Sequence, residues 1–193
     1  MTPANLAHLQ GLYAETDDPW NFRGSPYEAE RFVSVAQALP RQRYDAALEI
    51  GCGNGELARC IAPRCASYTG IDAVPAALDA ARIAVPSARF VEGFMPCRLP
   101  EPVGQPGYDL VLLSEILYFL DPSAIARIAE DLDRDHPAAD IVTVAWRGET
   151  GHALSGEDAI ATFIQASRRR SRTVRRTDSY RIDVFTPPRE RSA

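Results

Sequence analysis

Short apolar stretches alternate with longer amphipathic stretches through the middle of the chain. The apolar stretches predict β-strands, and the amphipathic stretches predict the helices that connect them. Strands that alternate with helices are typical of a parallel sheet with right-handed crossovers. No helix is expected over 94–107, because this segment contains four prolines and no helical periodicity. The strands are expected at 46–50, 66–71, 88–92, 108–114 and 140–146, and the connecting helices at 56–62, 75–84 and 122–135.

The C-terminal part of the chain follows a different pattern. Ser155, followed three residues later by Asp158, resembles a capping box and begins a helix predicted over 155–168. Two short strands follow at 172–177 and 180–186, and we expect them to close the sheet as an antiparallel pair. The sequence therefore predicts an α/β fold of the Rossmann-like kind. Its mostly parallel seven-stranded sheet would carry a C-terminal antiparallel strand pair and helices on both faces.

The residues ahead of the first strand form a segment of their own. Helices are predicted over 4–14 and 26–39, and the loop at 17–23 between them reads Asp-Asp-Pro-Trp-Asn-Phe-Arg. A loop that carries aromatic and charged side chains ahead of the sheet is a candidate lid over a ligand site. We therefore divide the chain into a helical lid or cap segment, residues 1–40, and an α/β domain, residues 41–193.

The composition is that of one ordinary globular domain. The chain has 193 residues, of which 46% are hydrophobic and 24% are charged. No apolar run approaches the roughly 20 residues needed to cross a bilayer. The N-terminus lacks the basic and apolar regions of a secretory signal. The expected location is cytoplasmic, without a membrane partner.

Cysteines and charges disfavour two further classes of function. Cys52, Cys60, Cys65 and Cys97 contain no C-x-x-C pair and have no clustered histidines nearby, so we expect neither a disulfide framework nor a metal site. The net charge of −5 argues against a polyanionic partner. All basic residues are Arg, and a cluster of them at 168–176 is typical of a solvated face. We therefore do not expect a nucleic-acid partner.

The most informative segment is the glycine-rich turn after the first strand. Gly51, Gly53 and Gly55 alternate with other residues, which lets the chain turn sharply and admit a ligand against bare backbone. The helix that follows presents unsatisfied N–H donors to such a ligand. A dinucleotide site needs a small residue at the last position of G-x-G-x-x-G/A, but here that position is Glu56, which would repel a pyrophosphate. S-adenosylmethionine (SAM) carries no phosphate, so this repulsion is absent.

Two carboxylates beside the turn support a nucleoside ligand. Asp72 ends the second strand, where an acidic side chain can accept both ribose hydroxyls. This feature fits NAD and SAM equally. Glu49 lies in the apolar first strand, and a buried carboxylate is costly unless it is paired. The ammonium group of a sulfonium nucleoside offers Glu49 a cationic partner, directly or through water.

These residues match motif I, E-x-G-x-G-x-G, of class I SAM-dependent methyltransferases, and further segments resemble the nodulation protein S (NodS)-like family. The resemblance spans nearly the whole chain, and it implies the class I fold, SAM as methyl donor and N-methylation of a glucosamine amine at the end of a chito-oligosaccharide. Two positions depart from the family pattern: Glu92-Gly93-Phe94-Met95 after the third strand, and Ala145, where His is common. The resembling segments are Asp18 to Phe22, Ser25 to Glu28, Leu39 to Tyr44, Leu113 to Leu120, Trp146 to Glu157 and Thr177 to Asp183.

The resemblance and the motifs together give an expected cofactor site. Phe94 and Met95 are expected to flank the adenine, and Arg31, which matches a basic position of the family, is a candidate for the cofactor carboxylate. Trp20 and Tyr27 could close over the cofactor or stack on a sugar ring. The full expected set is Trp20, Tyr27, Arg31, Glu49, Gly51, Cys52, Gly53, Asn54, Gly55, Asp72, Ala73, Phe94, Met95, Ser114 and Glu115.

Acceptor contacts are expected after the fourth and fifth strands. Glu115 is the first candidate for orienting a cationic or hydroxylated acceptor, and Tyr118 is the second. His152 is a candidate base near neutral pH, whereas His8 and His136 fit ordinary surface positions. An amine acceptor needs only a free lone pair, whereas an alcohol needs a base during attack.

Other functions remain open at this stage. The acceptor is expected to be a small molecule, either an amino sugar or related amine, or a hydroxyl group of a sugar or small metabolite. An NAD(P)-dependent oxidoreductase is disfavoured by Glu56 and by the antiparallel pair. A catalytically silent nucleoside-binding domain and an RNA methyltransferase are weaker alternatives.

Overall fold

The computed structural model describes residues 3–187, and the side chains from residue 6 onward. Seven strands form one sheet in the order β3-β2-β1-β4-β5-β7-β6. The strands are β1 (Tyr44–Ile50), β2 (Cys65–Asp72), β3 (Arg89–Glu92), β4 (Leu110–Ser114), β5 (Asp140–Trp146), β6 (Arg170–Arg176) and β7 (Tyr180–Thr186). The helices are α1 (Pro3–Glu15), α2 (Pro26–Ala38), α3 (Glu56–Ile61), α4 (Pro75–Ala84), α5 (Pro122–Asp135) and α6 (Gly156–Ala166).

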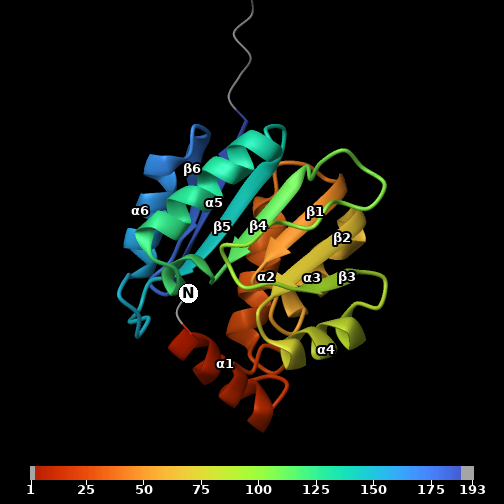
Figure 1. The fold of residues 1–193 in the computed structure, drawn as a ribbon, viewed down its shortest axis with the longest axis vertical. Helices are drawn as coiled ribbons and strands as arrows, with labels where there is room; N and C mark the ends of the chain where they lie inside the picture. Colours follow the sequence, from red (N-terminus) through yellow and green to blue (C-terminus); the bar gives the residue numbers. More distant parts are fainter. Residues whose placement is uncertain (1–2, 188–193) are drawn as a thin grey trace, which may run out of the picture.

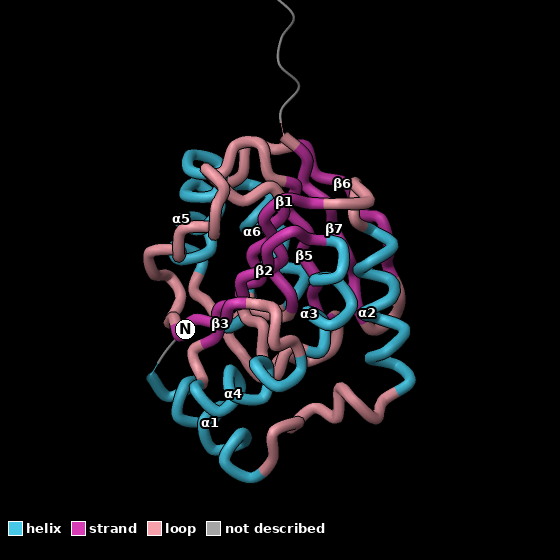
Figure 2. The backbone as a smooth tube through the Cα atoms, turned by 90° about the vertical axis from the view of Figure 1, so that its right-hand side faces the viewer, coloured by secondary structure: helices cyan, strands magenta, loops and turns pink. Residues whose placement is uncertain are grey.

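The first five strands pair in parallel, and β7 runs antiparallel to both β5 and β6. The sheet is therefore mostly parallel with an antiparallel pair at its C-terminal end, which confirms the predicted class I methyltransferase fold. The alternation of apolar side chains along each strand separates two cores. On β1, Leu48 and Ile50 pack into the core that α5 and α6 cover, and Tyr44 and Ala47 pack into the core on the other side, with α2, α3 and α4. Figure 2 shows the two layers of helices on either side of the strands.

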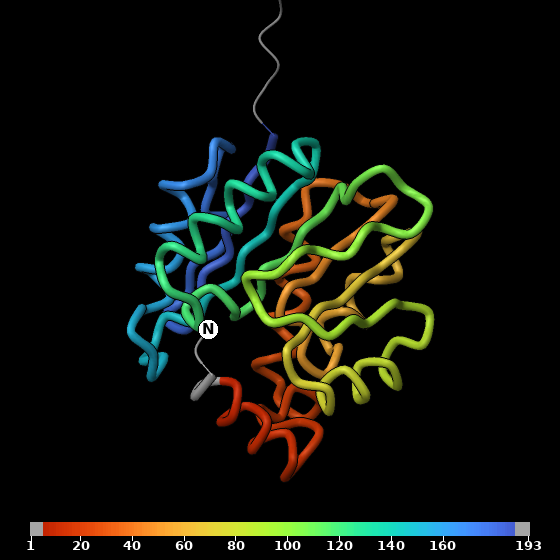
Figure 3. Tube along the Cα trace, in the orientation of Figure 1, coloured from red at the N-terminus to blue at the C-terminus, as the bar shows by residue number. Residues whose placement is uncertain are grey.

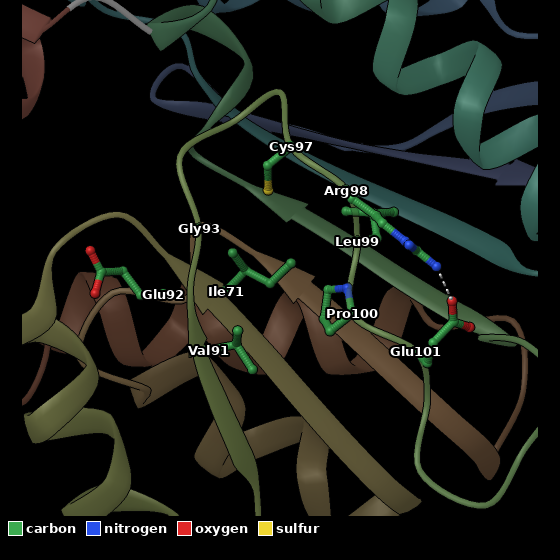
Figure 4. A pocket seen from close by; sticks show the side chains of 9 residues that line it. All are labelled: Ile71, Val91, Glu92, Gly93, Cys97, Arg98, Leu99, Pro100 and Glu101. Carbon is green, nitrogen blue, oxygen red and sulfur yellow. Dashed lines mark hydrogen bonds and ion pairs between the residues drawn. The ribbon is translucent and has the colours of Figure 1, made fainter.

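The segment between β3 and β4 forms no helix, as predicted. It runs as a loop across the face of the sheet that α5 also covers (Figure 3). Met95 is buried in the core under this loop, and Cys97 and Leu99 pack against that core. A loop fills less space than a helix, and a small cavity of about 280 Å³ remains beneath it (Figure 4). Apolar side chains such as Ile71 and Val91 line this cavity, and an exposed ion pair joins Arg98 to Glu101 at its rim.

The N-terminal segment lies beside the carboxyl ends of the parallel strands (Figure 1). Helix α1 packs on α4 through a small cluster of Tyr13, Val74 and Ala77. Helix α2 begins at a Ser25 cap, whose hydroxyl accepts a hydrogen bond from the Glu28 N–H at 3.3 Å. The predicted lid segment spans residues 1–40, and the predicted α/β domain spans residues 41–193. Residues 1–2 of the first and residues 188–193 of the second lie outside the described part of the chain.

Two local expectations can be compared directly with the structure. The capping motif is present, since Ser155 accepts a hydrogen bond from the Asp158 N–H at 3.1 Å. His136, in contrast, is not an ordinary surface residue. It is half-buried, its ring packs edge-on against Tyr108 at 5.1 Å, and its Nδ1 accepts a hydrogen bond from the Tyr108 N–H.

Within residues 3–187 we find no helix with the length and hydropathy needed to span a membrane.

Candidate active site

A cavity of about 700 Å³ opens at the carboxyl ends of the parallel strands. This is where open α/β sheets bind their ligands, because the loops that follow the strands diverge there. The N-terminal segment, the turn after β1 and the loops after β2, β3, β4 and β5 all contribute side chains. The site therefore combines residues from the whole length of the domain with residues of the predicted lid.

The glycine turn adopts the backbone conformation that its sequence predicts. Gly51, Gly53 and Gly55 all have positive φ, at 81°, 50° and 81°. The N–H groups of Gly51 and Cys52 donate to the Ile71 carbonyl at 2.8 and 2.9 Å, which fixes the turn to β2. A Cβ on Gly55 would come within 3.0 Å of Ala81, so this glycine lets α3 approach α4.

Asp72 holds the turn from the next strand. Its two carboxylate oxygens accept hydrogen bonds from the Gly53 N–H at 2.9 Å and from the Val74 N–H at 3.0 Å. Burial raises the pKa of Asp72, and these N–H donors oppose the rise because they stabilise the carboxylate. The turn and Asp72 therefore form one hydrogen-bonded unit, with the acidic group placed at the cavity wall where ribose hydroxyls can reach it.

Glu49 is buried at the base of the same region and also lines the cavity. The Tyr68 hydroxyl donates a hydrogen bond to Glu49 Oε2 at 2.6 Å. Burial raises the pKa of Glu49 to about 8, although the bond from Tyr68 lowers it, and nearby Asp72 raises it further. Glu49 is thus largely protonated at neutral pH in this structure, and a cation placed beside it would favour its ionised form.

Glu115 is the centre of the opposite end of the cavity, which we call the acceptor end. Oε1 accepts from Arg31 Nη1 at 2.5 Å, while Oε2 accepts from the Tyr118 hydroxyl and from the Trp146 N–H, both at 2.8 Å. Its backbone has a φ of 56°, which is strained for a residue with a side chain. Two donors that are distant in sequence, Arg31 and Trp146, and the nearby Tyr118 thus fix one carboxylate in place.

Arg31 is buried between two carboxylates. Its Nε donates to Glu28 Oε2 at 2.8 Å, and a second bond joins its Nη2 to the same oxygen, while Nη1 reaches Glu115. The guanidinium carbon lies 5.3 Å from the Phe32 ring centroid and 5.9 Å from that of Phe22. The structure therefore pairs Arg31 with protein carboxylates, and its expected contact with the cofactor carboxylate stays a prediction.

Tyr118 and His152 line the same end of the cavity. Burial and the Glu115 carboxylate raise the pKa of Tyr118, so its phenol remains protonated and acts as a donor to Glu115. The His152 ring lies 4.2 Å from the Phe119 centroid and 5.8 Å from the Tyr118 centroid. Burial lowers the pKa of His152, which leaves a neutral imidazole at pH 7.

Most of the sequence-predicted site residues line this one cavity. Gly55 and Phe94 do not. Gly55 is used for helix packing, and Phe94 is 37% exposed, so the expected adenine sandwich of Phe94 and Met95 is reduced to Met95. Those that line it are Trp20, Tyr27, Arg31, Glu49, Gly51, Cys52, Gly53, Asn54, Asp72, Ala73, Met95, Ser114, Glu115, Tyr118 and His152.

Several residues of the cavity wall were not predicted from the sequence. His8 is exposed on α1, as expected for a surface position, and it also lines the cavity. Tyr13 lies one turn further along the same helix, and Glu28 was detectable only as a carboxylate three residues before Arg31. Glu149 belongs to the loop after β5. The described residues contain no His, Cys, Asp and Glu cluster that could hold a metal ion.

The lid loop is tied to the glycine turn by one side chain. Asn54 Nδ2 donates to the Asp17 carbonyl at 3.1 Å and to Asp18 Oδ1 at 3.0 Å. Trp20 stacks on Phe22 with ring centroids 5.7 Å apart. These contacts fasten the aromatic loop to the glycine turn, and a lid role for this loop stays a prediction.

Comparisons with known proteins identify the family. A family model described as nodulation protein S (NodS) matches residues 2–135. The chain belongs to the nodulation protein S family. It is 28% identical over 159 residues to nodulation protein S of Bradyrhizobium diazoefficiens (strain JCM 10833 / BCRC 13528 / IAM 13628 / NBRC 14792 / USDA 110), covering 76% of this chain and 73% of that one.

Two further matches, one in sequence and one in structure, extend the comparison. A trans-aconitate 2-methyltransferase of Enterobacter sp. (strain 638) is 26% identical, with 73% of this chain and 75% of that protein covered. The crystal structure of N-methyltransferase NodS from Bradyrhizobium japonicum WM9 in complex with S-adenosyl-l-homocysteine has a TM-score of 0.77 at 23% identity. That match covers 95% of this chain and 99% of the other.

With the family and the fold established, this NodS-family protein is an S-adenosylmethionine-dependent methyltransferase that acts on a small-molecule acceptor. The residues present fit the cofactor. A turn of bare backbone, a carboxylate aimed at the ribose position and a buried carboxyl group beside the turn suit a nucleoside that carries positive charge and no phosphate. Bound SAM supplies an activated methyl group, and the protein supplies position and exclusion of water.

Proposed function

We propose that this NodS-family methyltransferase methylates the nitrogen of a small amine, and that the amine is the free amino group of an amino sugar. The observation that carries the proposal is the charge of the acceptor end. Glu28, Glu115 and Glu149 line the cavity with a single guanidinium, that of Arg31, which Glu28 and Glu115 share, so these three carboxylates outnumber the cation beside them by two. A protonated amine would supply the missing positive charge, because opposite charges attract strongly in a partly buried site.

The same groups can prepare the amine for methyl transfer. Glu115 is held by three donors, so it can accept a hydrogen bond from the acceptor nitrogen without moving. The amine must lose one proton before its lone pair is free. Neutral His152 can take this proton, or water at the cavity mouth can take it, and Glu115 then holds the nitrogen in line with the methyl group.

Aromatic side chains around the acceptor end support a sugar as the carrier of the amine. Tyr27 packs edge-on against Trp146, with ring centroids 6.4 Å apart, and Tyr118 stacks with Phe119 at 5.1 Å. Trp20 is 41% exposed at the mouth. Aromatic faces with hydrogen-bonding carboxylates between them suit a sugar ring, which has apolar faces and a polar rim.

We also propose that residues 1–40 act as a lid on the α/β domain of residues 41–193. The support is that the segment contributes Trp20, Tyr27 and Arg31 to the cavity and is fastened to the turn by Asn54. Methyl transfer requires water to be excluded from the reacting atoms, and a segment that covers the cavity would provide this exclusion.

The experiment compares matched acceptors. The purified protein is incubated with SAM and either chitobiose carrying one free amine or fully N-acetylated chitobiose, and methylated product is located by tandem mass spectrometry. We expect methylation on nitrogen of the free amine only. Methylation of both acceptors on oxygen would overturn the proposal.

A matched pair of variants tests the role of Glu115. Glu115→Gln keeps the size of the side chain and removes its charge, and we expect kcat/KM for the amine to fall about 100-fold. Glu30→Gln, on the exposed side of the same helix as Glu28, should change it less than about twofold. Equal activity of Glu115→Gln and the native protein would contradict the assignment.

An O-methyltransferase of a sugar or small metabolite is the second candidate. The observation that favours it is the neutral His152 imidazole, which could accept a hydroxyl proton during attack. The acidic lining disfavours an anionic acceptor, because the carboxylates of the cavity would repel a carboxylate on the acceptor.

A further inference from the structure

The hydroxyl of Tyr13 is a buried polar group without a partner. Tyr13 lies near the end of α1, its residue is only 6% exposed, and its hydroxyl makes no hydrogen bond in the structure. Among the described residues, the other side-chain atoms in this condition are Asn54 Oδ1, Thr143 Oγ1 and Arg175 Nε. A buried hydroxyl without a partner costs roughly 1–3 kcal/mol, so its retention calls for an explanation.

The hydroxyl lies directly over the glycine turn. A Cβ built on Gly53 would come within 3.1 Å of the Tyr13 oxygen, and the Gly53 N–H is the one that binds Asp72. Tyr13, Gly53 and Asp72 all line the cavity. The tyrosine therefore faces the cofactor part of the site across the bare backbone of the turn.

The surrounding contacts hold this geometry from two sides. Tyr13 packs with Val74 and Ala77 in the cluster that joins α1 to the domain, and Trp20 lies edge-on to its ring at a centroid distance of 5.5 Å. Asn54 fastens the following loop to the turn. These contacts involve the ring and the following loop, and none of them pairs the hydroxyl, which is enclosed against the glycine turn.

The electrostatic surroundings make the hydroxyl a donor. Burial raises the pKa of Tyr13, and the neighbouring Asp72, Cys52 and Asp18 raise it further, so the phenol stays protonated. The Asn54 backbone N–H faces the hydroxyl oxygen and partly offsets the rise in the pKa of Tyr13, whereas the Asn54 side-chain nitrogen donates to Asp17 and Asp18, so the O–H proton of Tyr13 keeps no acceptor. A ligand oxygen placed against Gly53 would be the natural acceptor.

We propose that the Tyr13 hydroxyl donates a hydrogen bond to an oxygen of SAM bound against Gly53, and that the lid helix thereby takes part in cofactor binding. The inference rests on the cofactor occupying this cavity. Two kinds of oxygen on SAM meet the chemistry: the ribose hydroxyls, which Asp72 also faces, and the carboxylate of the amino-acid part.

The test is Tyr13→Phe, which removes the hydroxyl and keeps the ring packed on Trp20. Binding of S-adenosylhomocysteine is measured by titration calorimetry, and thermal unfolding is measured without ligand. We expect the dissociation constant to rise about tenfold or more. The unliganded melting temperature should stay the same or rise, because an unsatisfied hydroxyl has been removed from a buried place.

Tyr108→Phe is the matched control. Its hydroxyl donates to the Pro100 carbonyl at 2.9 Å, away from the lining of the large cavity. It should show the opposite pattern, with a lower melting temperature and an unchanged dissociation constant. If Tyr13→Phe shows this control pattern, or binds within about twofold of the native protein, the proposal is wrong.

A second ligand locates the bond. 5′-Methylthioadenosine keeps the adenine and ribose and lacks the amino-acid part. If Tyr13→Phe weakens both ligands, the hydroxyl binds the ribose; if it weakens only S-adenosylhomocysteine, it binds the carboxylate. If the native protein binds neither ligand, the cofactor assignment is wrong as well. If the native protein and Tyr13→Phe bind equally well, only the role given to Tyr13 is wrong.

Discussion

The two ends of the cavity are built in different ways. The cofactor end is made largely of backbone: a glycine turn, the N–H groups bound to Asp72 and the start of α3. The acceptor end is made mostly of side chains from α2 and the segment after β4, which meet at Glu115 together with the Trp146 N–H at the end of β5. A backbone site can be specified by a few adjacent residues, whereas a side-chain site depends on the whole fold.

This difference explains how one fold can keep a cofactor and change its acceptor. The glycine turn tolerates few substitutions because its φ angles are positive and its neighbours are close. The acceptor end can be altered residue by residue, since each side chain enters from its own loop. Variants should therefore separate into those that affect the cofactor and those that affect the acceptor.

The largest expected effect follows from removing the cation of the acceptor end. Arg31→Met would leave Glu28 and Glu115 facing each other in a partly buried place, so we expect the free energy of unfolding to fall by about 3 kcal/mol. Urea denaturation measures this, with the exposed pair variant Arg59→Met as control. If Arg31→Met also abolishes binding of S-adenosylhomocysteine, the two ends are not separable and Arg31 contacts the cofactor.

The next largest effect tests the cofactor end. Asp72→Ala removes the acceptor of the Gly53 and Val74 N–H groups and the partner expected for the ribose, and we expect binding of S-adenosylhomocysteine to weaken about 100-fold. Asp45→Asn, on an exposed position of neighbouring β1, should leave affinity unchanged. Titration calorimetry measures the affinity of the native protein and of both variants for S-adenosylhomocysteine. Native affinity in Asp72→Ala would show that Asp72 does not support cofactor binding.

Glu49 makes the cofactor end depend on pH. Its pKa of about 8 lies above the value of an unfolded glutamate, so between about pH 4.5 and 8 the folded protein holds a proton that the unfolded chain has released. The free energy of unfolding should therefore fall as pH rises through this window, and Glu49→Gln should flatten the dependence.

Positive charge on SAM should favour ionised Glu49, so native affinity should increase by up to about tenfold per pH unit from about pH 6 to 8. Calorimetry in buffers of different ionisation enthalpy would also detect the released proton. A pH-independent affinity, with no proton release, would show that the cofactor's charges lie away from Glu49.

The smallest effect concerns His152 and sharpens the identity of the acceptor. An amine can pass its proton to water, so His152→Gln should lower kcat by about threefold at pH 7. An alcohol acceptor needs the base during attack, and the loss would then be on the order of 100-fold. Steady-state rates at saturating SAM separate these cases.

The comparison of the two ends also explains what could be predicted from the sequence. The strands, the missing helix between β3 and β4, the antiparallel pair and the unit of glycine turn and Asp72 all follow from local patterns, and the structure shows each of them. Phe94 was misplaced because adjacent positions in a loop can face opposite directions, and no periodicity indicates which one enters the cavity.

The network around Glu115 could not be predicted in this way. Arg31 lies 84 residues before Glu115 in the chain, and nothing in the local pattern of α2 shows that its guanidinium reaches that carboxylate. Tyr13 was missed for a related reason. Its spacing fits the apolar face of a packing helix, and only the unpaired state of its hydroxyl, which a structure alone reveals, separates it from a core residue.

The last strand of the sheet has a consequence for how the protein behaves at high concentration. Among residues 3–187, β6 is the last strand of the sheet and pairs with β7 alone, and it exposes Arg170 and Arg172. A second molecule that approached this edge with its own β6 would set guanidinium groups against guanidinium groups. Such like-charge repulsion discourages strand-to-strand polymerisation. Neutral β-branched residues at those two positions would remove this repulsion and leave an edge strand open to pairing with another molecule.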